Sequence, residues 1–219
     1  MITVLKIENH HLYRKSHPIP SYSKHSIMTK DHYSRLYRIM HWAIAITFLL
    51  LLLTVFLRLT WMNKENVAGI IKPFMAEKGM ELSNDDAIIL AKKIRKPMWE
   101  WHIYFGYALT GLFAIRFLLP LAGQMKFQNP RENGLTNLQR FQRYTYWVFY
   151  LCVIVSLVTG LIIELGPKEY KKNMEAIHEL SLYYLIPYII IHIGGVLRSE
   201  FVEKRKIISE IIGGSNRSQ

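Results

Sequence analysis

Four stretches of the chain lack charged residues and are rich in apolar ones. They span residues 39–57, 101–115, 144–163 and 180–197 and contain 19, 15, 20 and 18 residues. A helix that crosses about 30 Å of hydrocarbon needs roughly 20 apolar residues. Lipid offers the backbone no hydrogen-bond partner, so such segments must be helical. The pattern predicts an all-α integral membrane protein, a four-helix bundle with spans at about 37–61, 97–122, 144–165 and 176–202.

The connection between the first two predicted spans, residues 63–96, is long enough to contain structure of its own. Ser83-Asn84-Asp85-Asp86 precedes the segment AIILAKKIRK, a sequence typical of an N-capped helix with one apolar face. We therefore predict an extra amphipathic helix in this first loop. Two roles fit it, a helix lying on the outer membrane surface or a docking surface for a partner.

The distribution of charged residues predicts how the chain is oriented in the membrane. Lys and Arg number 28 against 16 Asp and Glu, a net charge of +12, and they flank the apolar runs. This placement favours membrane topology and contact with anionic lipid, and it speaks against a nucleic-acid partner. Sixteen basic residues fall on the side of the termini and ten on the other, so the positive-inside rule places both termini in the cytoplasm.

This organisation divides the chain into three parts. A polar, basic N-terminal segment covers residues 1–36, the membrane domain covers 37–202, and a C-terminal tail covers 203–219. The N-terminal segment has no apolar core of the kind found in a cleavable signal peptide, so the first apolar run is expected to remain as a span.

The single cysteine, Cys152, lies inside the third apolar run. One cysteine permits no intramolecular disulfide. It also excludes covalent haem attachment through Cys-x-x-Cys-His and a four-thiolate iron–sulfur cluster.

Histidines are the chemical signal in this sequence. Five of the nine lie in the polar N-terminal segment and are expected to be solvated, but His41, His102, His178 and His192 lie in or at the edge of predicted spans. Ionisable groups in membrane segments are costly and are functional suspects. Taken singly, each of the four fits an interfacial or capped histidine equally well.

Spacing and chain direction sort these four histidines into pairs. His178 and His192 are 14 residues apart on the fourth predicted span, which separates them by about 21 Å on nearly the same helix face. Because successive spans run in opposite directions, His41 shares a depth with His192 at the inner side, and His102 with His178 at the outer side. Inverting the protein preserves both pairs.

Two facing imidazole pairs have the layout of two bis-histidine haem sites, with no ligand from the third span. Zinc is the competing explanation, but it prefers four ligands that converge on one point. The two pairs are separated by most of the membrane, and a zinc ion at either pair would lack ligands.

Three arginines are candidates for binding an anion near the inner pair. Arg116 follows His102 by 14 residues, which places it on the same face at the depth of the inner pair. A haem propionate, a quinone oxygen or a lipid headgroup would satisfy it. Arg38 and Arg198 flank the inner histidines, where a similar role and an ordinary positive-inside anchor are both open.

The chain resembles the bacterial cytochrome b561 family and the related di-haem cytochrome b subunits of nickel–iron hydrogenases. The motifs are Arg38-Ile39-Met40-His41-Trp42 at the start of the first span, a histidine at the start of the second, and the 14-residue histidine spacing on the fourth. The resemblance covers about residues 35–200. It implies a four-helix protein of the bacterial inner membrane that carries two b-type haems.

The resemblance also indicates what these haems would do. We expect transmembrane electron transfer that exchanges electrons between the quinone pool and a redox partner, such as a dehydrogenase or hydrogenase subunit on the outer face. One alternative is a protein that acts alone as a superoxide:quinone oxidoreductase. A second, from another class, is a haem-free transporter or structural membrane protein whose histidines relay protons.

Overall fold

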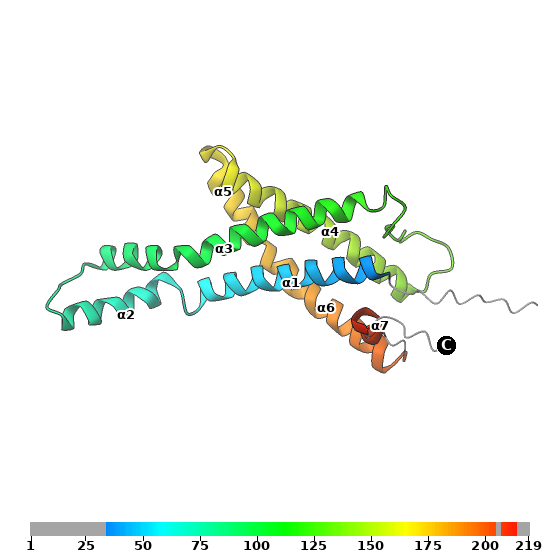
Figure 1. Ribbon diagram of the computed structural model, residues 1–219, viewed down its shortest axis with the longest axis horizontal. Coiled ribbons are helices and arrows are strands. Elements are labelled where there is room, and N and C mark those ends of the chain that lie inside the picture. Colours follow the sequence, from blue (N-terminus) through cyan, green and yellow to red (C-terminus); the bar gives the residue numbers. More distant parts are fainter. Residues whose placement is uncertain (1–33, 205–206, 214–219) are drawn as a thin grey trace, which may run out of the picture. The chain divides into compact units, whose positions relative to one another are not determined.

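A computed structural model describes residues 34–204 and 207–213 of the chain. The predictions for the N-terminal segment before residue 34, including its five histidines, lie outside the described residues. The described part is helical and contains no strand, which confirms the predicted all-α class. Its helices are α1 (Arg35–Leu59), α2 (Lys64–Glu77), α3 (Asn84–Leu118), α4 (Asn137–Leu165), α5 (Lys168–Glu179), α6 (Ser181–Phe201) and α7 (Ile207–Gly213), as labelled in Figure 1.

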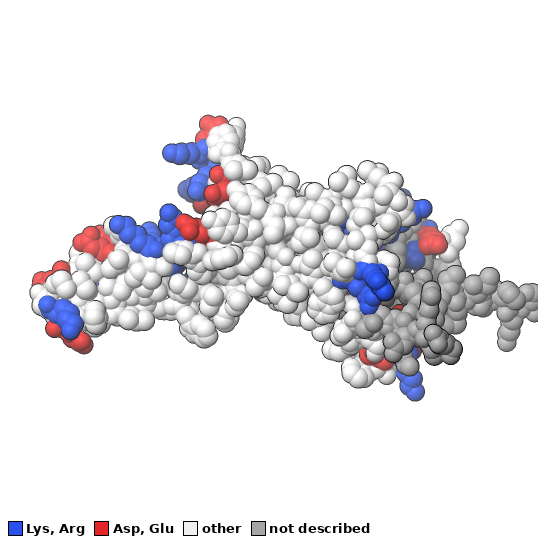
Figure 2. Space-filling model, viewed as in Figure 1, with Lys and Arg blue, Asp and Glu red and all other residues white. Residues whose placement is uncertain are grey.

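Three helical segments of the described part are long and apolar enough to cross a membrane. They are Arg35–Leu59, Asn137–Leu165 and Lys168–Phe201, the last of which joins α5 and α6. Figure 2 shows charged residues gathered toward the two ends of the visible face, with a broad band of uncharged surface between them. This separation of charge fits a protein whose middle lies in lipid.

The second predicted span differs from the other three. It corresponds to the C-terminal part of α3, which does not reach the hydropathy of a candidate span. The reason is local, because this helix ends at Leu118 and includes the polar residues His102 and Arg116.

The first loop folds as a helical hairpin. Ser83 caps a helix as predicted, and its hydroxyl accepts a hydrogen bond from the backbone N–H of Asp86 at 3.1 Å. This helix does not form a separate element, because it continues through Pro97 as the N-terminal extension of α3. Its partner helix, α2, was not predicted from the sequence. The two helices bury Ala68, Ala87 and Ala91 between them, where small side chains permit close approach.

The fourth predicted span, 176–202, covers the end of α5 and all of α6, which meet at Leu180. The backbone N–H of Leu180 bonds to the carbonyl of Ile177, and that of Tyr183 bonds to the carbonyl of Leu180. These three-residue steps tighten the turn between α5 and α6. Helix α5 packs against α4 after the short turn at Gly166 and Pro167. His178 and His192 therefore lie on the two successive helices of one helical stretch, Lys168–Phe201.

The apolar core of the bundle lies among α1, α3, α4 and α6. Leu109, Phe113 and Val153 are buried at its centre, and aromatic rings of Phe48 and Phe149 pack around them. Many large apolar side chains of α1, α4 and α6 face outward instead. Outward apolar surface of this kind is what lipid contact requires.

Two facing histidine pairs as the candidate functional site

His102 of α3 and His178 of α5 face each other. Their ring centres are 6.3 Å apart, and the ring planes are almost perpendicular at 89°. Both side chains are half-buried. We call this arrangement the outer pair, after its predicted side of the membrane.

Thr54 of α1 fixes the ring nitrogen that His102 uses as a donor. The Thr54 hydroxyl donates to the carbonyl of Leu51 at 2.6 Å and lies 2.8 Å from Nδ1 of His102. A hydroxyl has one proton, and with that proton donated to Leu51 the Thr54 oxygen accepts from Nδ1 of His102 in the tautomer that is protonated there. The other ring nitrogen, Nε2, then presents a lone pair.

Helix α4 holds His178 in the same chemical state. Nδ1 of His178 lies 2.9 Å from the carbonyl oxygen of Ser156, which can only accept, so Nδ1 is again the donor. Gly160 makes the close approach possible. A Cβ atom at Gly160 would lie 3.1 Å from Cε1 of His178, tighter than ordinary contact. Both rings of the outer pair thus keep Nε2 available as a ligand.

His41 of α1 and His192 of α6 form the inner pair. Their ring centres are 6.1 Å apart, at an interplanar angle of 42°. His192 stacks on Tyr188 at 5.7 Å, and Tyr188 stacks on Phe149 at 3.7 Å. Within the described residues, no hydrogen bond reaches a ring nitrogen of either inner histidine. Aromatic packing therefore orients this pair.

The spacing of both pairs suits one metal ion between two imidazoles. A metal–imidazole bond is about 2 Å long and the ring centre lies roughly 1 Å beyond the nitrogen, so two rings on one ion have centres about 6 Å apart. The measured values are 6.1 and 6.3 Å. In the part of the chain that the structure describes, no group of three or more His, Cys, Asp or Glu could hold a metal ion.

The two pairs are separate sites. Thr54, which contacts the outer pair, follows His41 by 13 residues on the same helix, so the sites lie about 20 Å apart along α1. The core residues Phe48, Phe113 and Phe149 fill the space in the bundle between these levels. Apolar packing there keeps the local dielectric low.

The three predicted arginines differ in their surroundings. Arg116 is only 7% exposed, and its Nη1 is buried without a hydrogen-bond partner in the described part of the chain. Its guanidinium carbon lies 4.4 Å from the ring centre of Phe127. Nε of Arg38 is likewise buried and unsatisfied, again among the described residues. Arg198 is exposed and lies 3.9 Å from Glu203 in an ion pair.

Sequence reasoning named the histidines but missed the residues that hold them. Thr54, Ser156 and Tyr188 were not singled out, because each acts only through a ring that folding brings to it. One pattern in the sequence could have indicated the contact of α4 with His178. Ser156 and Gly160 are small residues four positions apart in the third apolar run, a spacing typical of close approach between membrane helices.

The helices and their outward apolar surface define an α-helical membrane protein that contains two facing histidine pairs. A family model for prokaryotic cytochrome b561 matches residues 32–214, and the chain belongs to that family. No curated protein and no solved structure matches the chain. Membership indicates a bacterial membrane protein that binds b-type haem and transfers electrons across the membrane.

Proposed function

We propose that this protein transfers electrons across the bacterial inner membrane through two b-type haems, one at the outer pair and one at the inner pair. The observation that carries the proposal is the matching separation of the rings, 6.3 Å between His102 and His178 and 6.1 Å between His41 and His192. A haem at either site would be held by the two imidazoles of the pair and would supply one-electron chemistry.

Contacts within the chain orient the histidine rings that are proposed to bind haem. At the outer pair, Thr54 and the Ser156 carbonyl accept Nδ1–H and leave Nε2 of each ring as the ligand atom. At the inner pair, Tyr188 holds the plane of His192 by stacking. These contacts limit rotation of the rings, so less ordering is needed when a haem binds.

The proposal includes four crossings, with the C-terminal part of α3 as the fourth span. In this scheme, polar His102 and Arg116 face ligands in the bundle rather than lipid, which accounts for the low hydropathy of that helix. Both termini lie in the cytoplasm, and the parts are a segment 1–36, a membrane domain 37–202 with its loop 63–96, and a tail 203–219. The span limits 37–61, 97–122, 144–165 and 176–202 are retained as approximate bounds.

Arg116 is the proposed anchor for an oxygen atom on the inner side. Its unsatisfied Nη1 needs an acceptor, because a buried guanidinium without a partner is costly. A haem propionate or a quinone carbonyl meets that need. Arg38 is proposed for the same role through its buried Nε, and Arg198 for a weaker one because it is exposed and paired with Glu203.

We propose that the protein exchanges electrons with quinone and with a redox subunit on the outer face of the membrane. Helix α2 supports this choice over a protein that acts alone, because Ile70 and Phe74 are 72% and 57% exposed on it. Exposed apolar groups on an extramembrane hairpin are typical of a protein interface. Copurification of a dehydrogenase or hydrogenase subunit with the intact chain tests this part. Isolation of a fully active single chain would favour the superoxide:quinone alternative.

The decisive experiment measures haem content per polypeptide and the spectrum of the dithionite-reduced protein. We expect two haems per chain and sharp b-type α and Soret bands. A single haem would contradict the assignment of two equivalent pairs. A colourless protein that folds normally would favour the haem-free transporter.

A further inference from the structure

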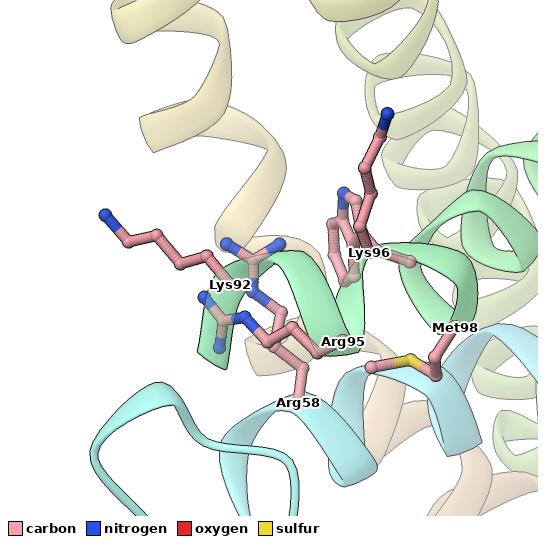
Figure 3. A pocket seen from close by; sticks show the side chains of 6 residues that line it. Arg58, Lys92, Arg95, Lys96 and Met98 are labelled. Carbon is pink, nitrogen blue, oxygen red and sulfur yellow. The ribbon is translucent and has the colours of Figure 1, made fainter. Parts of the chain in front are cut away.

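A small cationic pocket lies beside the outer pair, where the end of α1 meets α3. Its volume is about 160 Å³, and Figure 3 shows Arg58 rising from α1 into the side chains of α3. We call it the Arg58 pocket. Six residues line it, four of them cations and none of them acidic: Arg58, Lys92, Arg95, Lys96, Met98 and Trp99.

The charges of the Arg58 pocket are poorly compensated. Lys96 lies 3.6 Å from Glu100, but among the described residues no ion pair within 4 Å involves Arg58, Lys92 or Arg95. Arg95 reaches only the carbonyl of Met62, at 3.4 Å. Two acidic residues of α5, Glu175 and Glu179, act on Arg58 at longer range. Like charges gathered in this way favour a bound anion.

A stack of planar groups connects the Arg58 pocket to the outer pair. The guanidinium carbon of Arg58 lies 3.9 Å above the ring centre of Trp99. Trp99 in turn stacks on His102 with ring centres 4.4 Å apart and planes within 5°. The guanidinium is therefore within about 8 Å of the His102 ring, a range over which charges interact strongly when partly buried.

The size and position of the Arg58 pocket limit the kind of ligand that it can bind. A pocket for a whole organic ligand measures about 300–1,000 Å³, whereas a cavity that holds one water measures about 10–15 Å³. The 160 Å³ of the Arg58 pocket suits a single tetrahedral or planar oxyanion group. Arginine forks match phosphate oxygens. The site follows directly after the first apolar run, which ends at Leu57, and thus lies at the expected level of lipid headgroups.

We propose that the Arg58 pocket binds a phosphate group, from a lipid headgroup or free in solution, and that this bound charge lowers the reduction potential of the haem held by His102 and His178. Binding itself depends only on the pocket. Its effect on the potential rests on the proposed function. The direction follows from Coulomb's law, because a nearby anion disfavours addition of an electron.

The first measurement detects binding without reference to haem. Inorganic phosphate is added to the purified full chain in a phosphate-free maltoside detergent at constant ionic strength, and the melting temperature is followed. We expect a saturable rise, since a ligand that binds only the folded state stabilises it. Phosphatidylglycerol replaces inorganic phosphate in a second arm, and a rise in that arm alone identifies the lipid headgroup as the source.

The second measurement is a redox titration of the haem-loaded chain with each probe. We expect one of the two midpoint potentials to fall as the probe saturates. Arg58→Gln and Arg95→Gln should weaken binding by at least about tenfold and abolish the fall. Lys72→Gln is the matched control, because Lys72 is a cation on α2 that bonds to Asn84 outside the pocket.

The outcomes separate the two proposals. Absence of haem would overturn the proposed function while leaving the melting test of the Arg58 pocket intact. Melting temperatures that respond to neither probe would overturn the pocket, as would an equal response in Arg58→Gln and wild type. Binding that leaves both potentials unchanged would overturn the effect on the outer haem.

Discussion

The outer and inner histidine pairs have nearly the same spacing, yet different forces orient their rings. In the outer pair, Thr54 and the Ser156 carbonyl fix Nδ1 of His102 and His178 as a donor. In the inner pair, rings stack on rings, and Tyr188 lies between His192 and Phe149. Hydrogen bonding specifies the protonated nitrogen, whereas stacking specifies only the plane. Two histidine pairs can thus have nearly the same ring separation while only one of them has its protonated nitrogen set by hydrogen bonds.

The largest expected effect is the loss of haem from one histidine pair while the other pair keeps its haem. His178→Ala should remove about one of two haems, because one imidazole alone holds the iron weakly. Adding His102→Ala should remove no more, whereas adding His192→Ala should remove the second. Haem per chain, measured on folded protein, checks this. His10→Ala, outside both pairs, is the control, and equal losses in all double variants would disprove the pairing.

Gly160→Ala should disturb the outer pair and leave the inner pair intact. The new Cβ would lie 3.1 Å from Cε1 of His178, so the ring must shift by a few tenths of an ångström. We expect a changed low-spin electron paramagnetic resonance signal for one haem and partial loss of that haem. Gly111→Ala is the matched control on α3, because its Cβ would meet no atom within 4 Å. Unchanged signals in both variants would refute the close approach of α4.

Thr54→Val should raise the potential of the outer haem. A hydrogen bond from Nδ1 increases the basicity of the ligand and favours oxidised iron, and valine removes the acceptor. Thr54→Ser should restore the wild-type value.

The control for this effect lies on the same helix. Thr47 is also buried, and its hydroxyl donates to the carbonyl of Ala43 at 2.7 Å; among the described residues it makes no hydrogen bond to a histidine. Thr47→Val therefore loses a comparable backbone hydrogen bond. Redox titration that shows the same shift for both valine variants would assign the effect to helix structure rather than to His102.

The smallest expected effect concerns stacking at the inner pair. Tyr188→Phe keeps the ring and should change neither haem content nor the outer potential. Tyr188→Leu removes the stack, an interaction of about 0.5–1.5 kcal/mol, and should broaden only the inner signal. Magnetic resonance spectra of the two variants check this difference. Broadening of the outer signal instead would show that the sites are not independent.

Local sequence was sufficient for much of the fold. Uncharged runs predicted α1, α4 and the region of α6, and Ser83 predicted a helix start. The boundary between α5 and α6 at Leu180 was not predictable, because no proline or glycine lies at that position. The pairing of α2 with α3 was also not predicted. The residues at this contact, Ala68, Ala87 and Ala91, are small and add little to the hydrophobic periodicity of either helix.

The sequence by itself determined that the chain enters lipid and that four histidines are placed in or beside its apolar runs, because hydropathy and residue identity are local properties. Only the tertiary structure decided which groups meet those rings. Thr54 and His102 are 48 positions apart, and Ser156 reaches His178 from another helix. Such contacts depend on helix rotation and register, which many side chains set together and no short segment encodes.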